Sequence, residues 1–254
     1  MVRNTLLQGE KVTKVFRQGG TANKVLDSVD VDIYEKDFTV IMGSSGAGKS
    51  TLLYALSGMD KISGGKVLYQ GKEISSLKEK KMARLRAQEF GFVFQQTHLV
   101  SNLTLLENIL VAGYVSGKEG QKEIQDYAAN LLAQMGAVHA KDRLPSNVSG
   151  GEAQRAAIAR AMIGRPGILF ADEPTGALNK SNTTEVLNLL TELNRSGQSI
   201  LMVTHDMRAA VRGNRILYLE DGKILDELHL SDYSELEEKG RENEVSRWLT
   251  KLQW

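Results

Sequence analysis

The chain of 254 residues contains no cysteine, which excludes disulfides, thiolate nucleophiles and thiolate metal sites. Its four histidines are scattered and have no metal-type spacing, so we expect no structural metal. They are His98, His139, His205 and His229. The chain also lacks a large excess of either charge, because its formal net charge is +1 at pH 7. No global basic field therefore points to nucleic acid as a partner.

Long apolar runs are absent as well. No stretch of about 18 residues is apolar and uncharged enough to cross a bilayer, and the N-terminal residues lack the apolar run of a signal peptide. If the protein works at a membrane, we expect another chain to supply the spans. The length of the chain suffices to bury a sizeable core, as one large domain or as a core with a smaller subdomain.

Short apolar strand candidates alternate with helical segments along most of the chain. From Val29, apolar and polar residues alternate as VDVDIY, which is typical of a half-buried strand, and the apolar run FTVIM follows as a central strand. Further strand candidates are KVLYQ, FGFVF, GILFAD, SILMVTHD and RILYLED. This alternation predicts an α/β sheet with substantial parallel pairing. The segment EDGK, from Glu220 to Lys223, predicts a hairpin turn, because Asp-Gly tolerates the positive φ that such a turn needs.

Two segments depart from this alternation. Between about Thr97 and Val148 the strand pattern stops, and helical periodicity predicts an inserted helical subdomain. The charged segment after Asp226 ends in ENEVSRWLTKLQW, which predicts a C-terminal helix. The apolar residues on one face of that helix are Val245, Trp248, Leu249 and Leu252. This face either packs on its own domain or makes a docking or dimer contact.

The strongest signal is GSSGAGKST, a glycine-rich phosphate-binding loop (P-loop) that directly follows the strand FTVIM. Its glycines let the loop bend around a phosphate and present backbone N–H groups without a Cβ in the way. Lys49 supplies a charge for the β- and γ-phosphates, and the Ser50 hydroxyl is placed to ligate Mg²⁺. The next residues form a helix whose positive end faces the phosphates. The expected loop residues are Gly43, Ser44, Ser45, Gly46, Ala47, Gly48, Lys49, Ser50 and Thr51.

Polar residues follow three further strand candidates. ILFADEP places Asp172 at the end of a buried strand, where it can hold the Mg²⁺ shell, and Glu173 beside it, where it can orient or deprotonate water. Acids at a strand end can also be plain helix caps. Gln95 and His205 follow strands that would finish on the same edge of the sheet, where ligands of such sheets bind. We therefore predict that both residues lie in the active site.

The segment VSGGEAQRAAIAR places Ser149 and two glycines in front of an alanine-rich helix. Ser149 and Glu152, three residues apart, predict a capping box in which each satisfies the other's backbone donor. A helix N-terminus without side-chain bulk is alternatively a place for an anion. From the residues alone, both interpretations stay open.

These motifs closely resemble those of the ATP-binding cassette (ABC) ATPases. GSSGAGKST is similar to the family's P-loop, VSGGE to its signature LSGGQ and ILFADE to its Walker B motif, while Gln95 and His205 match its Q-loop and H-loop. The resemblance runs from about residue 5 to residue 226, with all motifs in the family's order. It implies a P-loop NTPase fold with a RecA-like α/β core, an antiparallel β subdomain and an inserted α-helical subdomain. It also implies ATP hydrolysis, with ATP and Mg²⁺ as cofactors.

The resemblance implies a role for each matched residue. Phe16 matches the position where an aromatic ring stacks on adenine, and Ser149 with its two glycines would bind the γ-phosphate of an ATP held by a second copy. The implied catalytic residues are Glu173, His205, Gln95 and Lys49. The implied metal-binding residues are Ser50, Gln95 and Asp172. The implied nucleotide-binding residues outside the P-loop are Phe16, Gln95, Ser149, Gly150, Gly151, Glu152, Asn179 and His205.

Two residues depart from the family pattern. Glu152 replaces the signature glutamine, a change familiar in one subfamily and able to complete the capping box. Asn179 stands where the D-loop normally has aspartate, and an amide cannot carry the charge of a carboxylate. We expect communication across the dimer to be tuned differently. Hydrolysis is still expected, because Glu173 is intact.

The resemblance implies four segments. They are an ATPase core with the β subdomain and P-loop at 1–96, a helical subdomain contacting a permease at 97–148, the rest of the core at 149–226, and a C-terminal helical extension at 227–254. The implied partners are a second copy and an integral membrane permease with a large extracytoplasmic domain, which places the chain peripherally on the cytoplasmic face of the cell membrane. No nucleic-acid partner is expected.

The finer resemblance is to the subfamily of macrolide exporters, lipoprotein-releasing ATPases and the cell-division ATPase, and most to bacitracin-type peptide-resistance transporters. It implies peptide resistance or export. One alternative is an ATPase that transmits force to regulate the cell envelope, and another is a soluble ABC ATPase. The second alternative is less favoured, because the cassette has neither the long coiled coils nor the zinc-binding cysteines of DNA-type members.

Overall fold

The chain folds into two compact units. Unit 1 comprises residues 1–82 and 197–254, and unit 2 comprises residues 83–196. The computed structural model describes residues 3–18, 21–252 and 254. The division falls inside helix α2 (Glu79–Glu89), so unit 2 is an insertion within the sequence of unit 1.

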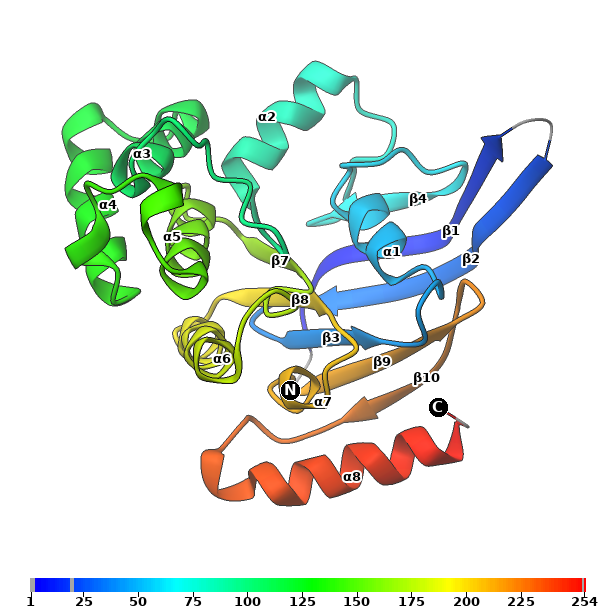
Figure 1. The fold of residues 1–254 in the computed structure, drawn as a ribbon. Helices are drawn as coiled ribbons and strands as arrows, with labels where there is room; N and C mark the ends of the chain where they lie inside the picture. The colour runs from blue at the N-terminus through cyan, green and yellow to red at the C-terminus, as the bar shows by residue number, and fades with distance from the viewer. Residues whose placement is uncertain (1–2, 19–20, 253) are drawn as a thin grey trace. The chain divides into compact units, whose positions relative to one another are not determined.

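Unit 1 contains an antiparallel sheet with the strand order β2-β1-β4-β5 (Figure 1). Its strands are β1 (Thr5–Gln18), β2 (Thr21–Tyr34), β4 (Gly64–Tyr69) and β5 (Lys72–Glu73). The predicted alternation in β2 is confirmed, because Val29, Val31 and Ile33 are buried while the residues between them are less so. Only one face of this strand therefore contributes to the core.

A second set of strands in unit 1 is mostly parallel. It comprises β3 (Phe38–Met42), β8 (Ser199–Val203), β9 (Arg215–Glu220) and β10 (Lys223–His229). Strand β3 pairs in parallel with both β8 and β9, and all its residues are buried, as its apolar sequence predicts. The predicted hairpin joins β9 to antiparallel β10, with Asp221 at φ 46° and Gly222 at φ 72°.

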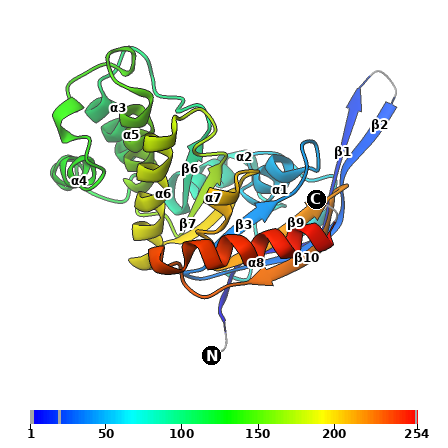
Figure 2. The same ribbon diagram turned by 60° about the horizontal axis from the view of Figure 1, so that its bottom comes forward.

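The C-terminal helix of unit 1 packs on its own unit. Unit 1 has α1 (Lys49–Leu56), α7 (Met207–Ala210), the 3₁₀ turn η3 (Glu235–Glu237) and α8 (Glu238–Lys251). Figures 1 and 2 both show α8 lying along β10. Val245, Trp248 and Leu249 are buried, and the Trp248 indole N–H donates to Asp226 Oδ2 at 2.9 Å. Of the two alternatives for this apolar face, packing within the unit is the one observed.

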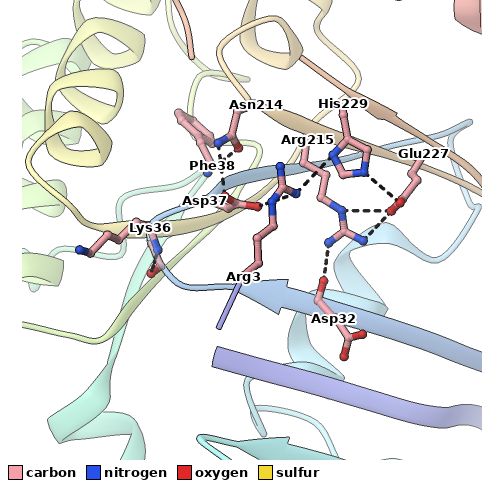
Figure 3. A network of polar contacts seen from close by, with 10 residues as sticks. Arg3, Asp32, Lys36, Asp37, Phe38, Asn214, Arg215, Glu227 and His229 are labelled. Carbon is pink, nitrogen blue, oxygen red and sulfur yellow. Dashed lines mark hydrogen bonds and ion pairs between the residues drawn. The ribbon is translucent and has the colours of Figure 1, made fainter. Parts of the chain in front are cut away.

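A polar network ties the start of the chain to the β9–β10 hairpin (Figure 3). The Arg3 guanidinium lies 3.6 Å from Asp37 Oδ2 and 3.4 Å from His229 Nδ1. Arg215 Nε donates to Glu227 Oε2 at 3.0 Å, and His229 Nε2 donates to Glu227 Oε1 at 3.1 Å. These contacts hold the hairpin in place away from the P-loop end of β9.

Unit 2 combines two parallel strands with a group of helices. Strand β6 (Phe90–Phe94) pairs in parallel with β7 (Ile168–Asp172). The helices are α3 (Leu105–Ser116), α4 (Gln121–Gln134), α5 (Gly150–Met162) and α6 (Lys180–Arg195), with 3₁₀ turns η1 (Val138–Ala140) and η2 (Pro145–Asn147). The helical periodicity predicted after Thr97 is confirmed by α3 and α4. Helix α5 packs against α3, α4, α6 and β6, and its small alanines permit close contact on several sides.

No helix within the described residues has the length and apolar character needed to cross a membrane.

Candidate functional site

The P-loop of unit 1 adopts a backbone that requires glycine. Gly43, Gly46 and Gly48 have φ values of 155°, 86° and 101°, in the region that side chains disfavour. A Cβ on Gly43 would lie only 1.9 Å from the Leu219 carbonyl oxygen, whereas a Cβ on Gly46 would meet open space. Gly43 therefore lets the loop pass close to β9, and the space next to Gly46 is open.

The loop opens helix α1 without a side-chain cap. Gly48 is the N-cap and makes no side-chain capping bond, so the N-cap residue itself does not satisfy the first amides of the helix. Lys49 Nζ donates to the Gly43 and Ser44 carbonyl oxygens at 2.9 and 2.8 Å, which folds the ammonium group across the loop. Backbone donors, a cation and the Ser50 hydroxyl thus stand together, and these groups fit a triphosphate with Mg²⁺.

A carboxylate that we did not predict also contacts the loop. The Ser44 hydroxyl donates to Glu220 Oε1 at 2.7 Å, and the Tyr218 hydroxyl donates to Glu220 Oε2 at 3.0 Å. The bond from Ser44, followed by the one from Tyr218, lowers the pKa of Glu220, while burial and this carboxylate raise the pKa of Tyr218 to about 12. The strand register predicts this contact. Met42 pairs with Tyr218, so Ser44 and Glu220, each two residues later in its strand direction, lie beside each other.

Two more predicted residues belong to unit 1. His205 follows β8, whose Val203 pairs with Ile41 of β3, so His205 and the P-loop leave the sheet at the same edge. Phe16 lies on β1 and is 44% exposed. Lys14 Nζ lies over one face of the Phe16 ring, 4.8 Å from its centroid, and this cation–π contact restrains the ring.

Unit 2 brings Gln95, Asp172 and Glu173 to one strand edge. Phe94 and Asp172 are paired residues in the parallel register of β6 and β7, so Gln95 and Glu173 both follow this pair directly. Glu173 has φ 47°, a left-handed backbone that is costly for a residue with a side chain and typical of functional sites. A Cβ on Gly176 would lie 2.9 Å from Gln95 Nε2, which shows that the glutamine packs against the loop after β7.

Helix α5 holds both loops at that edge. The buried Gln154 donates through Nε2 to the Phe94 and Pro174 carbonyl oxygens at 2.9 and 2.7 Å. Arg160 of the same helix donates to the Thr97 and His98 carbonyl oxygens at 2.8 and 2.6 Å. We did not predict either tie, because each joins residues distant in the sequence. They link the helix behind VSGGE to the segment around Gln95.

The predicted capping box at the start of α5 is confirmed. The Ser149 amide and hydroxyl each donate to Glu152 Oε2 at 2.7 Å, and the Glu152 amide donates back to Ser149 Oγ at 3.2 Å. His139 Nε2 lies 2.7 Å from Glu152 Oε1, a contact that we did not predict. Hydrogen bonds from the Ser149 hydroxyl and amide, and then from His139, lower the pKa of Glu152 to about 2.

The glycines of this motif adjoin the start of α6. A Cβ on Gly151 would lie 2.4 Å from Asn182 Oδ1, and one on Gly150 would contact Leu178 at 3.7 Å. Asn179 is the N-cap of α6, and its side-chain oxygen accepts from the Asn182 amide at 2.9 Å. The Asn179 side chain therefore caps α6, in addition to any role in a dimer.

The predicted site residues thus fall into one group in each unit. Unit 1 carries Phe16, the P-loop and His205, and unit 2 carries Gln95, Ser149, Gly150, Gly151, Glu152, Asp172, Glu173 and Asn179. No cluster of three or more histidine, cysteine or acidic side chains that could hold a metal occurs among the described residues.

Sequence comparisons place these motifs in a family. The ABC transporter family matches residues 26–176. "Bacitracin export ATP-binding protein BceA" of Halalkalibacterium halodurans is 38% identical over 230 residues, which is 90% of this chain and 90% of that protein. "Lipoprotein-releasing system ATP-binding protein LolD" of Aquifex aeolicus is 40% identical over 88% of this chain and 97% of that protein.

A third relative is longer. "Macrolide export ATP-binding/permease protein MacB" of Wolinella succinogenes is 40% identical over 223 residues, 88% of this chain, which spans about a third (34%) of that protein's length. Among solved structures, the ATP-binding cassette MJ0796, dimeric and bound to ADP and Pi after hydrolysis, has a TM-score of 0.83 at 34% identity and covers 90% of this chain and 100% of its own. The chain therefore belongs to the ABC transporter family and is an ATP-hydrolysing cassette that uses ATP and Mg²⁺.

Proposed function

We propose that two copies of this chain pair head to tail around two ATP molecules and drive a separate membrane permease with a large extracytoplasmic domain. The process served is peptide resistance or export of the bacitracin type. The observation that carries this proposal is the alignment with the bacitracin export ATP-binding protein, which spans 90% of both chains, together with the dimeric state of the similar solved cassette.

In this proposal, the residues of unit 1 hold the nucleotide. Lys49, whose Nζ donates to the carbonyl oxygens of its own loop at 2.9 and 2.8 Å, turns to the β- and γ-phosphates when ATP binds. The amides at the start of α1 bind the phosphates, and the exposed face of Phe16 stacks on adenine. His205, at the same strand edge, contacts the γ-phosphate.

Metal ligands and a base complete the proposed site. Ser50 of the P-loop, Gln95 and Asp172 would hold Mg²⁺, which would neutralise charge on the phosphate oxygens when bound. Glu173 orients the attacking water and takes its proton, and its left-handed backbone at φ 47° supports a functional role. Gln154 and Arg160 keep the Gln95 segment in register with the signature helix.

Pairing supplies the mechanical step. Ser149, Gly150 and Gly151 contact the γ-phosphate bound by the other copy, so ATP favours the closed state by contacts that the open state lacks. The helical segment 97–148 contacts the permease, with the residues around His98 to Asn108 nearest to it, and passes the movement on. The core segments 1–96 and 149–226 and the extension 227–254 complete the cassette, which lies on the cytoplasmic face of the membrane.

Substitution of Glu173 by Gln tests the enzymatic part. Loss of the proton acceptor should stop hydrolysis after ATP has bound, so the full chain should accumulate as an ATP-dependent dimer that ADP does not support. Size-exclusion chromatography and phosphate release measure the two properties. Hydrolysis at the rate of the unsubstituted chain would remove Glu173 from its assigned role.

Identification of the partner tests the cellular part. A tagged chain is recovered from detergent-solubilised native membranes, its partner is identified, and ATPase activity is assayed with and without that partner. A permease with a large extracytoplasmic domain that stimulates hydrolysis supports the proposal. A many-span permease docked to a binding protein, or no membrane partner at all, contradicts it.

A further inference from the structure

The charged group beside the signature serine is itself held by a histidine. His139 lies in η1, and its Nε2 is 2.7 Å from Glu152 Oε1. An ionised carboxylate only accepts hydrogen bonds, so Nε2 carries the proton and donates it. The His139 side chain is 57% exposed, whereas the Glu152 side chain is 15% exposed. Solvent therefore reaches the imidazole much more freely than the carboxylate.

We propose that His139 is a positioning residue that controls the ATP-driven pairing of two copies of the chain. It holds the Glu152 carboxylate and offsets its charge while the Ser149 hydroxyl turns toward the γ-phosphate. This inference rests on the proposed function, because it takes Ser149 as the group that meets the phosphate of a second copy. It goes further by making the strength of pairing dependent on the protonation of one side chain.

A single hydrogen atom limits what the Ser149 hydroxyl can bind. The Ser149 hydroxyl donates its only hydrogen to Glu152 Oε2, and a phosphate oxygen can only accept. Ser149 cannot serve both acceptors, so binding to the phosphate breaks its bond to Glu152. The Ser149 amide still donates to the same oxygen at 2.7 Å, and His139 still donates to the other, so the carboxylate stays hydrogen-bonded after the hydroxyl turns.

The charge of Glu152 also affects pairing. The low pKa of Glu152, about 2, means that the carboxylate is ionised at neutral pH, where it repels an approaching phosphate. An imidazolium at 2.7 Å offsets that charge, whereas a neutral imidazole only supplies a hydrogen bond. Pairing should therefore be stronger where the imidazole is protonated than where it is neutral.

The surroundings single out His139 among the described residues. It is the titratable side chain that contacts Glu152, while Arg155, the next basic residue on α5, pairs with Glu185 of α6 instead. Helix α4 packs against η1, and no ion pair from the described residues of α4 reaches His139. The charged residues after η1 make no ion pair with either partner in the described structure. They are Lys141, Asp142 and Arg143.

Helix α3 provides an internal comparison. Its capping box has nearly the same dimensions, with the Thr104 amide and hydroxyl donating to Glu107 Oε2 at 2.7 and 2.8 Å and the Glu107 amide donating back at 3.2 Å. The described structure gives Glu107 no histidine partner. Capping alone therefore does not require the imidazole, and its presence at the signature calls for another reason.

The experiment uses the full chain with Glu173→Gln and measures the ATP concentration for half-maximal dimer formation at about pH 6 and about pH 8. The comparison is with the same chain carrying His139→Gln, whose amide keeps a hydrogen-bond donor but cannot gain a charge. A matched control carries His229→Gln, which removes the histidine of another exposed pair, 3.1 Å from Glu227 in unit 1 (Figure 3).

The two histidine variants should separate at acidic pH. Near pH 8 the His139→Gln chain should pair like its parent, and near pH 6 it should need about three to five times more ATP, while the His229→Gln chain follows the parent at both values. A merely structural role of His139 would give the same offset at both pH values. Such a constant offset, or no offset, would overturn the inference.

Glu152→Gln in the same background completes the test. If His139 acts through the carboxylate, its substitution should have no further effect once Glu152 is uncharged. An undiminished effect of His139→Gln in that chain would contradict the proposal. If the parent forms no ATP-dependent dimer at either pH, the proposed function fails instead; if the dimer forms and the histidine has no pH-specific effect, only the present inference fails.

Discussion

Helices α1 and α5 both begin at glycine-rich motifs, but they differ in how their N-termini are capped. Helix α1 has Gly48 as N-cap and no side-chain capping bond, whereas α5 has Ser149 and a complete capping box with Glu152. The backbone at α1 needs positive φ at three glycines, whereas Ser149 has an ordinary extended conformation at φ −68°. The first N-terminus has no side-chain cap, whereas the second is capped with a carboxylate that accepts from the Ser149 amide.

In the proposed mechanism, this difference gives the two sites different tasks. The amides at an uncapped N-terminus can bind phosphate without breaking a side-chain capping bond, and only Lys49 has to leave the carbonyl oxygens of its own loop. At a capped N-terminus, the serine hydroxyl must leave the capping carboxylate before it can bind a phosphate oxygen. Its contact with phosphate is therefore weaker and easier to reverse. An ATPase that must open after each cycle benefits when one of its two phosphate contacts is of the second kind.

The largest expected effect comes from Lys49→Ala, which removes the cation of the uncapped site. Hydrolysis should fall by about a hundredfold or more, because the charge on the β- and γ-phosphates loses its main counterpart. Phosphate release and the binding of a fluorescent nucleotide measure this loss. Lys72→Ala on β5 serves as the control, since this exposed lysine lies in none of the motifs. Activity within about twofold of the parent would show that backbone amides alone bind the phosphates.

A smaller effect is expected from Ser149→Ala at the capped site. In the Glu173→Gln chain, the ATP concentration for half-maximal dimerisation should rise about tenfold, because the hydroxyl contact with phosphate is lost. The free energy of unfolding should also fall by about 1 kcal/mol through loss of the cap. Chromatography and urea unfolding follow the two changes separately.

Thr104→Ala isolates the cost of a lost cap. It removes a box of nearly the same geometry on α3, so its loss of unfolding free energy should match that of Ser149→Ala at about 1 kcal/mol. Measured on the isolated full chain, it should not reproduce the tenfold change in dimerisation. Equal effects of both substitutions on dimerisation would mean that Ser149 acts only through helix stability.

The sequence predicts those parts of this comparison that depend on local spacing. The buried strand FTVIM, the P-loop after it, the capping box and the Asp221–Gly222 turn are all read from neighbouring residues, and each is present. Local spacing carries such information because hydrophobic period and turn geometry act over a few residues. It left the apolar face of α8 undecided, since periodicity shows that a face is buried and not what buries it.

The contacts that were not predicted all cross between elements. Glu220 reaches Ser44 through the register of β9 against β3, and His139 reaches Glu152 from a 3₁₀ turn thirteen residues earlier. Neither residue type is unusual at its position, so no local pattern marks it. The Glu220 contact could have been inferred once β9 was placed parallel beside β3, whereas the His139 contact depends on where the fold places η1 relative to the start of α5.

The smallest expected effect concerns a third helix N-terminus, that of α6, which is capped by a neutral group. Asn179→Asp keeps the oxygen that accepts from the Asn182 amide and adds a negative charge at the positive end of the helix. The free energy of unfolding should rise by about 0.5 kcal/mol, which corresponds to about 1–2 °C in the midpoint of thermal unfolding. Asn179→Ala should lower the midpoint, because it removes the cap altogether. A lower midpoint for Asn179→Asp as well would show that nearby carboxylates outweigh the helix dipole, and would give a physical reason for an amide at this position.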